Sequence, residues 1–192
     1  MDVMRFQEIE HKFVVDAAFD LDTFRMRADA LGPARRTRLE VRDRYFLTED
    51  GRARRYVLRH RFDDELHQLT LKSLTRDAEV RDEINLDLGH HAGDQAAQVD
   101  ALVARMGVVW TGDIVKHIDV WHFPDCEVVH YVASSEGREV CCVEFEALGQ
   151  ASIEDALAVI ARYERATGFD AHARTHGSLV DLLFPGVLPP RS

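Results

Sequence analysis

The chain has 192 residues, of which 46% are hydrophobic and 30% charged, and its formal net charge is −10 at pH 7. This composition is typical of a globular protein and excludes a disordered chain, while the length suits one domain with a sizeable core. The negative charge disfavours nucleic-acid binding through a basic surface. Because the sequence has no apolar run of membrane-spanning length and no signal-peptide pattern, we expect a cytoplasmic protein without nucleic-acid or membrane partners.

The first part of the chain is expected to hold a strand, a helix and a second strand. Residues 6–15 alternate with the period of two that is typical of a strand. Asp20 or Asp22 can cap a helix that ends at Gly32, just before a proline. Residues 38–48 alternate again and predict the second strand.

A hairpin is expected next. Residues 49–51 have the sequence Glu-Asp-Gly, which is a turn signal. Residues 55–62 and 67–72 then have the pattern of short strands, joined by the acidic turn at residues 63–65. Residues 80–88 alternate as a further strand.

The rest of the chain continues this pattern. A helix is predicted at about residues 94–106, with an apolar side formed by Val99, Leu102, Val103 and Met106. A later helix should open at Ser152 and end at Gly168, and residues 179–184 form a short apolar segment. Between these helices, strands are expected at residues 112–123, 126–133 and 139–147.

Residues 1–184 are expected to form one domain, and residues 185–192 a frayed C-terminal tail. About eight antiparallel strands with helices inserted between them indicate the α+β class. Eight strands can close into a barrel, which removes the exposed sheet edges.

The charged residues fall on one face of each strand when they are sorted by parity. Glu8, Glu10 and Lys12 share a face of the first strand. Residues two apart lie roughly 7 Å from each other, so two glutamates can converge on one hard cation such as Mg²⁺ or Mn²⁺. Five further strands offer charged groups in the same way, namely Arg59, Arg61, Lys72, Arg81, Glu83, Lys116, Glu144 and Glu146.

Parity does not say whether these charged faces point outward or inward. Pointing outward, they would be the solvated side of an ordinary sheet. Pointing inward, they would enclose six cations and five carboxylates, which is costly unless every charge has a partner. A polyphosphate bound with a divalent metal supplies partners for both signs.

In this order and spacing, the charged residues resemble the CYTH, or triphosphate tunnel metalloenzyme, family. Further matches are the stretch at residues 43–46 and the serine-led segment at residues 178–183. The resemblance implies an eight-stranded antiparallel β-barrel, called a triphosphate tunnel, with helices packed outside. It rests on Glu-x-Glu-x-Lys at 8–12, Arg-x-Arg at 59–61, Thr-x-Lys at 70–72, Arg-x-Glu at 81–83, Lys116 and Glu-x-Glu at 144–146.

The resemblance also implies a role for each matched residue. Lys12, Glu83 and Glu144 would take catalytic roles. Ile118 stands where many members carry arginine, which leaves the identity of the substrate open. The metal, Mg²⁺ or Mn²⁺, would be bound by Glu8, Glu10 and Glu146. The triphosphate would be bound by Lys12, Arg59, Arg61, Lys72, Arg81 and Lys116.

The expected function is divalent-metal-dependent hydrolysis of a triphosphate inside the barrel. The substrate would be inorganic tripolyphosphate or an organic triphosphate such as thiamine triphosphate or a nucleotide. One alternative is a class IV-type adenylyl cyclase that makes cyclic AMP from ATP, and another is a non-catalytic module that binds a phosphorylated ligand. The expected partner is the small-molecule triphosphate, and a homodimer is left open.

Overall fold

The computed structural model describes residues 7–64, 66–74 and 80–188. Phe6 and Glu65, which the sequence places in a strand and in a turn, lie outside the described residues, as do residues 189–192 of the expected tail. None of the helices in the described part of the chain has the length and apolar character that crossing a membrane requires. The elements are β1 (Gln7–Val15), α1 (Leu21–Ala30), β2 (Arg35–Thr48), α2 (Glu49–Arg54), β3 (Tyr56–Phe62), β4 (His67–Ser73), β5 (Val80–Asp87), α3 (Gln95–Ala104), β6 (Val108–His122), β7 (Cys126–Ser135), β8 (Arg138–Ala147), α4 (Ile153–Thr167) and α5 (Leu179–Leu183).

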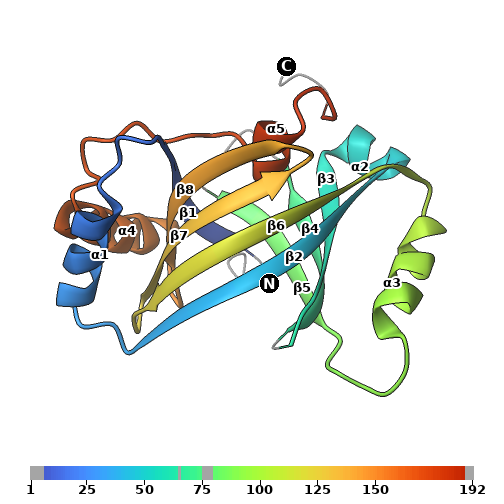
Figure 1. The fold of residues 1–192 in the computed structure, drawn as a ribbon, viewed down its shortest axis with the longest axis horizontal. Coiled ribbons are helices and arrows are strands. Elements are labelled where there is room, and N and C mark those ends of the chain that lie inside the picture. Colours follow the sequence, from blue (N-terminus) through green and yellow to red (C-terminus); the bar gives the residue numbers. More distant parts are fainter. Residues whose placement is uncertain (1–6, 65, 75–79, 189–192) are drawn as a thin grey trace.

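The strands form a closed antiparallel barrel in the order β1-β5-β4-β3-β2-β6-β7-β8 (Figure 1). Strand β1 closes it, because residues 7–9 pair with β5 whereas residues 10–15 pair with β8. Strands β2 and β6 are longer than predicted because they pair with each other along residues 35–48 and 108–122. The predicted α+β fold, with an eight-stranded antiparallel barrel and helices outside it, is confirmed.

The register brings the charged rows of neighbouring strands onto the same side of the barrel wall. Glu10 lies opposite Glu146, and Lys12 lies opposite Glu144, across β1 and β8. Directly opposite residues in an antiparallel pair project from the same face of the sheet. These charged residues line a cavity inside the barrel, so the charged rows face inward. The apolar residues between them on β1 and β8, such as Phe13 and Phe145, face outward and pack against the helices.

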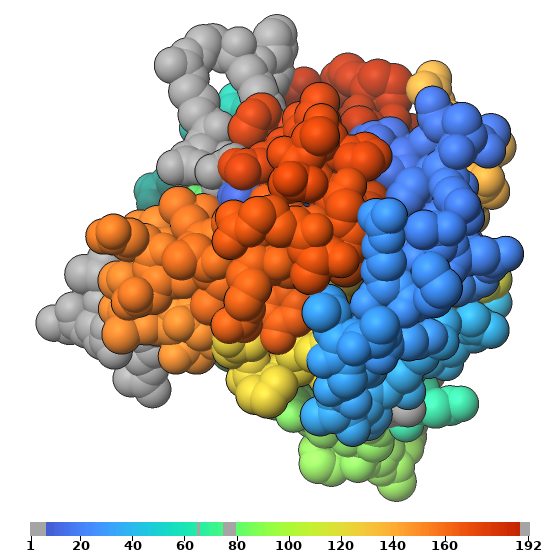
Figure 2. Space-filling view, turned by 90° about the vertical axis from the view of Figure 1, so that its left-hand side faces the viewer, coloured from blue at the N-terminus to red at the C-terminus, as the bar shows by residue number. Residues whose placement is uncertain are grey.

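Helix α4 covers the apolar outer rows of β1 and β8. The Ser152 hydroxyl caps its first turn by accepting a hydrogen bond from the Asp155 N–H at 3.1 Å. Gly168 ends the helix with φ of 90°, which glycine adopts without steric cost. Ile160 is buried in a core that includes Phe13 of β1. Helix α1 packs beside α4, and Figure 2 shows the two segments, blue and orange, side by side on one face.

The Ile160→Ala variant should lose about 2–5 kcal/mol of unfolding free energy, because it leaves a cavity in this core. Ile153, the first residue of the same helix, is 40% exposed. The Ile153→Ala variant should therefore change the unfolding free energy by no more than about 0.5 kcal/mol. Urea denaturation of both variants measures the difference, and equal losses would contradict the packing of α4 against the barrel.

Helix α3 presents a narrower apolar side than the sequence predicts. Val103 is fully buried in a cluster with Phe46 and Leu58. Leu102 and Met106, in contrast, are 63% and 53% exposed. The helix ends at Ala104, before Met106, and it lies at one side of the barrel (Figure 1). The prediction that both residues belong to the apolar side was wrong.

Residues 49–51 open the short helix α2, whereas the sequence predicts a turn. The Thr48 hydroxyl caps this helix by accepting a hydrogen bond from the Gly51 N–H at 2.8 Å. A side chain at Gly51 would lie only 2.6 Å from the Tyr56 carbonyl oxygen. The glycine therefore permits close packing of the helix on β3, and the turn expected from its sequence does not form.

Helix α5 packs against one end of the barrel. Ser178 and Asp181 form a reciprocal cap, since the Asp181 N–H donates to the Ser178 hydroxyl at 3.1 Å and the Ser178 N–H donates to the Asp181 carboxylate at 3.0 Å. Leu183 is buried in a cluster with Val57 and other barrel residues. Leu188, which the sequence places in a frayed tail, is buried in the same cluster, because its apolar side chain gains from leaving water.

Candidate active site

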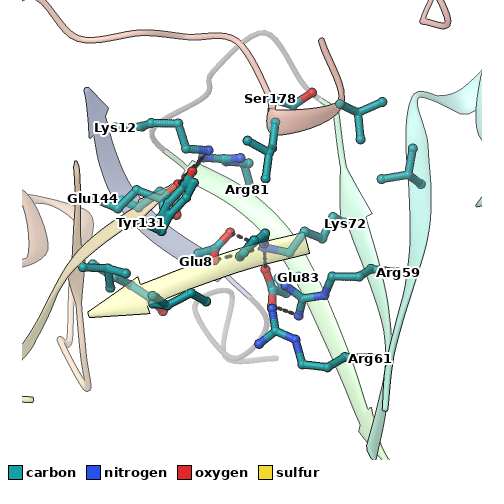
Figure 3. A pocket seen from close by; sticks show the side chains of 18 of the residues that line it. Glu8, Lys12, Arg59, Arg61, Lys72, Arg81, Glu83, Tyr131, Glu144 and Ser178 are labelled. Carbon is teal, nitrogen blue, oxygen red and sulfur yellow. Dashed lines mark hydrogen bonds and ion pairs between the residues drawn. The ribbon is translucent and has the colours of Figure 1, made fainter. Parts of the chain in front are cut away.

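All eleven charged residues predicted for the site line one cavity of about 280 Å³ inside the barrel. The close-up in Figure 3 shows labelled side chains among them, such as those of Lys12, Arg59 and Lys72, pointing from different strands toward the same space. The inward orientation, which parity leaves open, is the one that the structure adopts. The eleven residues are Glu8, Glu10, Lys12, Arg59, Arg61, Lys72, Arg81, Glu83, Lys116, Glu144 and Glu146.

One group of charges surrounds Lys12. Its Nζ lies 2.9 Å from Glu144 and 3.3 Å from Glu10, which also contacts Arg81. The Tyr131 hydroxyl donates a hydrogen bond to Glu144 at 2.7 Å. Burial alone would lower the pKa of the Lys12 ammonium, but Glu144 outweighs it and the pKa is raised. Lys12 is therefore charged at neutral pH, and it lines the cavity.

A second group surrounds Lys72. Its Nζ lies 2.5 Å from Glu83 and 3.3 Å from Glu8, and an Arg59 nitrogen lies 3.6 Å from Glu83 (Figure 3). Arg59 also donates to the Thr70 hydroxyl at 3.0 Å. Burial would raise the pKa of the Glu83 carboxyl, but Lys72 and Arg59 lower it to about 2. Glu83 is therefore ionised, and its carboxylate lies close to two cations, Lys72 and Arg59.

Asp43 on β2 is a member of the site that the sequence analysis did not select. It is fully buried, accepts two hydrogen bonds from Arg61 at 2.7 and 2.8 Å, and lies 2.7 Å from the Lys116 ammonium. Burial would raise the pKa of this carboxyl, but Lys116, Arg61 and Arg59 hold it well below its ordinary value. The sequence does contain a signal for Asp43, because residues 43–46 resemble a stretch of the family's pattern and Asp43 lies on the same face of its strand as Tyr45.

The sequence of this chain matches a known protein family over most of its length. The CYTH domain model matches residues 7–168. The chain belongs to the CYTH family. A comparison with curated proteins gave no match.

Solved structures share the CYTH fold over nearly the whole chain. PH1012 from Pyrococcus horikoshii has a TM-score of 0.70 at 18% identity, over 92% of this chain and 99% of that chain. A Bacillus halodurans protein, described as an adenylate cyclase candidate, has a TM-score of 0.58 at 18% identity, over 93% and 99% of the two chains. HpAC1 from Hippeastrum, described as having a dominant triphosphatase activity, has a TM-score of 0.56 at 14% identity, over 95% and 98%. At these identities the similarity shows the fold.

Two carboxylates that line the cavity, Glu8 and Glu146, have the chemistry of ligands for a divalent cation. No described residue forms an ion pair with Glu146, and burial together with the neighbouring Glu8 raises the pKa of its carboxyl to about 8. A cation there would relieve the repulsion between the two carboxylates. Among the described residues, however, no three histidine, cysteine, aspartate or glutamate side chains are arranged to hold a metal. Glu10 is turned toward Arg81 and Lys12 instead.

Proposed function

We propose that this CYTH protein hydrolyses a triphosphate substrate in the barrel cavity with the help of a divalent metal ion. The observation that carries the proposal is the enclosed set of six cations, which belong to five different strands and all line one cavity. Such a set is costly to bury unless every charge has a partner, and a phosphate chain bound with a divalent metal would supply partners for both the cations and the carboxylates of the cavity. The family includes triphosphatases and acts on small-molecule triphosphates, which supports this substrate class.

The cations would bind the phosphate chain by exchanging protein carboxylates for phosphoryl oxygens. Arg59 and Arg61 are guanidinium groups, which can form two parallel hydrogen bonds to one phosphate. Lys72 and Lys116 would add point charges from strands β4 and β6, which lie on either side of β3 and β2 in the barrel. Because each of these four cations already contacts Glu83 or Asp43, the substrate competes with carboxylates that hold the cations in place.

The metal would be held by Glu8 and Glu146, and by Glu10 if it leaves Arg81. Mg²⁺ is commonly bound by one or two carboxylates together with substrate phosphates and water, so two preformed carboxylates suffice. When bound, the ion would neutralise charge on the phosphoryl oxygens and favour attack at phosphorus.

Lys12, Glu83 and Glu144 would take part in the chemical step. Burial alone would raise the pKa of the Glu144 carboxyl, but Lys12 outweighs burial and the pKa is lowered. This carboxyl is therefore ionised, like that of Glu83. An ionised carboxylate accepts a hydrogen bond from water and can orient that water toward phosphorus. Lys12 would stabilise the negative charge that develops on the phosphate oxygens in the transition state.

The first test is phosphate release from a panel of substrates: tripolyphosphate, thiamine triphosphate and the nucleoside triphosphates, each with Mg²⁺ and with Mn²⁺. We expect release from at least one substrate, and loss of that release when the metal is removed with EDTA. Full activity in EDTA would contradict the metal requirement. Tight binding of these ligands without release would favour a binding module over an enzyme.

An adenylyl cyclase is the second candidate, because the Bacillus halodurans protein with the same fold is described in those terms. A cyclase needs the same set of phosphate-binding cations, since its reaction also leaves negative charge on a phosphate chain. Chromatography of the products from ATP separates the two functions. Cyclic AMP and pyrophosphate would identify a cyclase, whereas ADP and phosphate would identify a triphosphatase.

A further inference from the structure

The barrel cavity has an aliphatic wall opposite its charged side. We define the aliphatic wall as Leu39 on β2, Ile118 and Val120 on β6, and Val129 on β7, which all line the cavity. Leu39 lies opposite Ile118, and Val120 lies opposite Val129, so the four side chains form one continuous strip across three paired strands. Ile118 and Val120 each retain 9% of their surface exposed.

An inorganic polyphosphate gains nothing from such a wall. Tripolyphosphate carries charge along its whole length, and an aliphatic surface removes water from that charge without replacing its hydrogen bonds. The cations already cover the side of the cavity formed by β1, β3, β4 and β5. An uncharged group attached to the phosphate chain would, in contrast, be stabilised by leaving water against this strip.

We propose that the substrate is an organic triphosphate whose uncharged, apolar group packs on the aliphatic wall while the cations hold its phosphate chain. The proposal rests on the proposed function and narrows its substrate class. Lys116 lies two residues before Ile118 on the same face of β6, with its ammonium above the Tyr131 ring at 5.8 Å. It marks the border between the phosphate-binding side and the aliphatic wall.

The chemistry of the aliphatic wall also limits how the organic group is recognised. Its four side chains have no hydrogen-bond donor or acceptor. Glu127, the inward-facing residue two positions before Val129 on β7, lies 2.8 Å from the His122 ring and is thereby engaged. Recognition on this wall therefore depends on apolar area and shape.

The test compares phenyl triphosphate with tripolyphosphate under the same metal conditions. For the wild-type protein we expect kcat/KM to be at least about 10-fold higher for phenyl triphosphate, since a well-filled apolar contact discriminates by about 10–200-fold. The Ile118→Asn variant should lose most of this preference, chiefly through a higher KM for phenyl triphosphate. The Ile118→Val variant, which keeps an aliphatic surface, should retain it.

Val115→Asn is the matched control, because Val115 lies on the opposite face of the same strand and outside this cavity. It should leave the preference unchanged. Equal kcat/KM for the two substrates in the wild-type protein, or an equal fall for both in Ile118→Asn, would overturn the inference. If neither substrate is hydrolysed, the proposed function fails instead, and the inference is then decided by the Kd values of the two ligands: tripolyphosphate binding as tightly as phenyl triphosphate would overturn it.

Discussion

Replacing Glu8 with glutamine should lower kcat/KM for a triphosphate by about 10²–10³-fold, because it weakens binding of the metal ion that would stabilise the developing negative charge. Glu8 and Glu146 both line the cavity, and their carboxylates repel each other. The glutamine keeps the shape of the side chain but removes the charge that would attract a divalent cation. The Mg²⁺ concentration that gives half-maximal phosphate release should rise in the same variant.

The fold should survive this change, because Lys72 keeps its closer contact with Glu83 at 2.5 Å. Circular dichroism checks the fold, and a titration of free Mn²⁺ by electron paramagnetic resonance measures metal binding without turnover. Glu40→Gln is the matched control, since the Glu40 side chain is 66% exposed on the outside of β2. Unchanged activity with an unchanged Mg²⁺ dependence in Glu8→Gln would contradict the metal role of Glu8.

The strands and the faces of their charged residues could be predicted from the sequence, because alternation is a local property. Which face points inward could not. That depends on the pairing of β1 with both β5 and β8, which joins residues distant in the chain. The resemblance to the CYTH family supplied this missing information, since it implies a closed barrel whose charged residues point inward. The structure then places the predicted residues in one cavity, while their roles as ligands and catalysts stay predictions.

Asp43 shows why one member of the site was missed. In β2 the charged residues occupy both faces, because Arg42 and Arg44 pair with Asp113 on the outside of the barrel. The alternation that marks the other strands is therefore hidden at this position. The aliphatic wall was missed for a related reason, because apolar residues that line a cavity have the same pattern as apolar residues that form a core.

Asp43→Asn should destabilise the protein by about 3–5 kcal/mol, the cost typical of leaving buried charges without their partner. Arg61 and Lys116 both rely on this carboxylate at hydrogen-bonding distance. Asp113→Asn is a matched control, because Asp113 also pairs with two arginines but at a partly exposed site on the outer surface. It should cost about 1 kcal/mol or less. Urea denaturation at neutral pH measures both values, and equal losses would contradict the buried role of Asp43.

Acid and ligand should each narrow the stability gap between the wild-type protein and Asp43→Asn. The pKa of the Asp43 carboxyl is lowered in the folded protein. Its contribution to the unfolding free energy is therefore fully present above the ordinary aspartate pKa of about 3.9 and is lost as the pH falls.

In the Asp43→Asn variant, tripolyphosphate would supply the missing negative charge to Arg61 and Lys116. It should therefore raise the melting temperature of Asp43→Asn more than that of the wild-type protein, in which the ligand must displace the carboxylate. An equal shift in both proteins would mean that the phosphate chain does not reach these two cations.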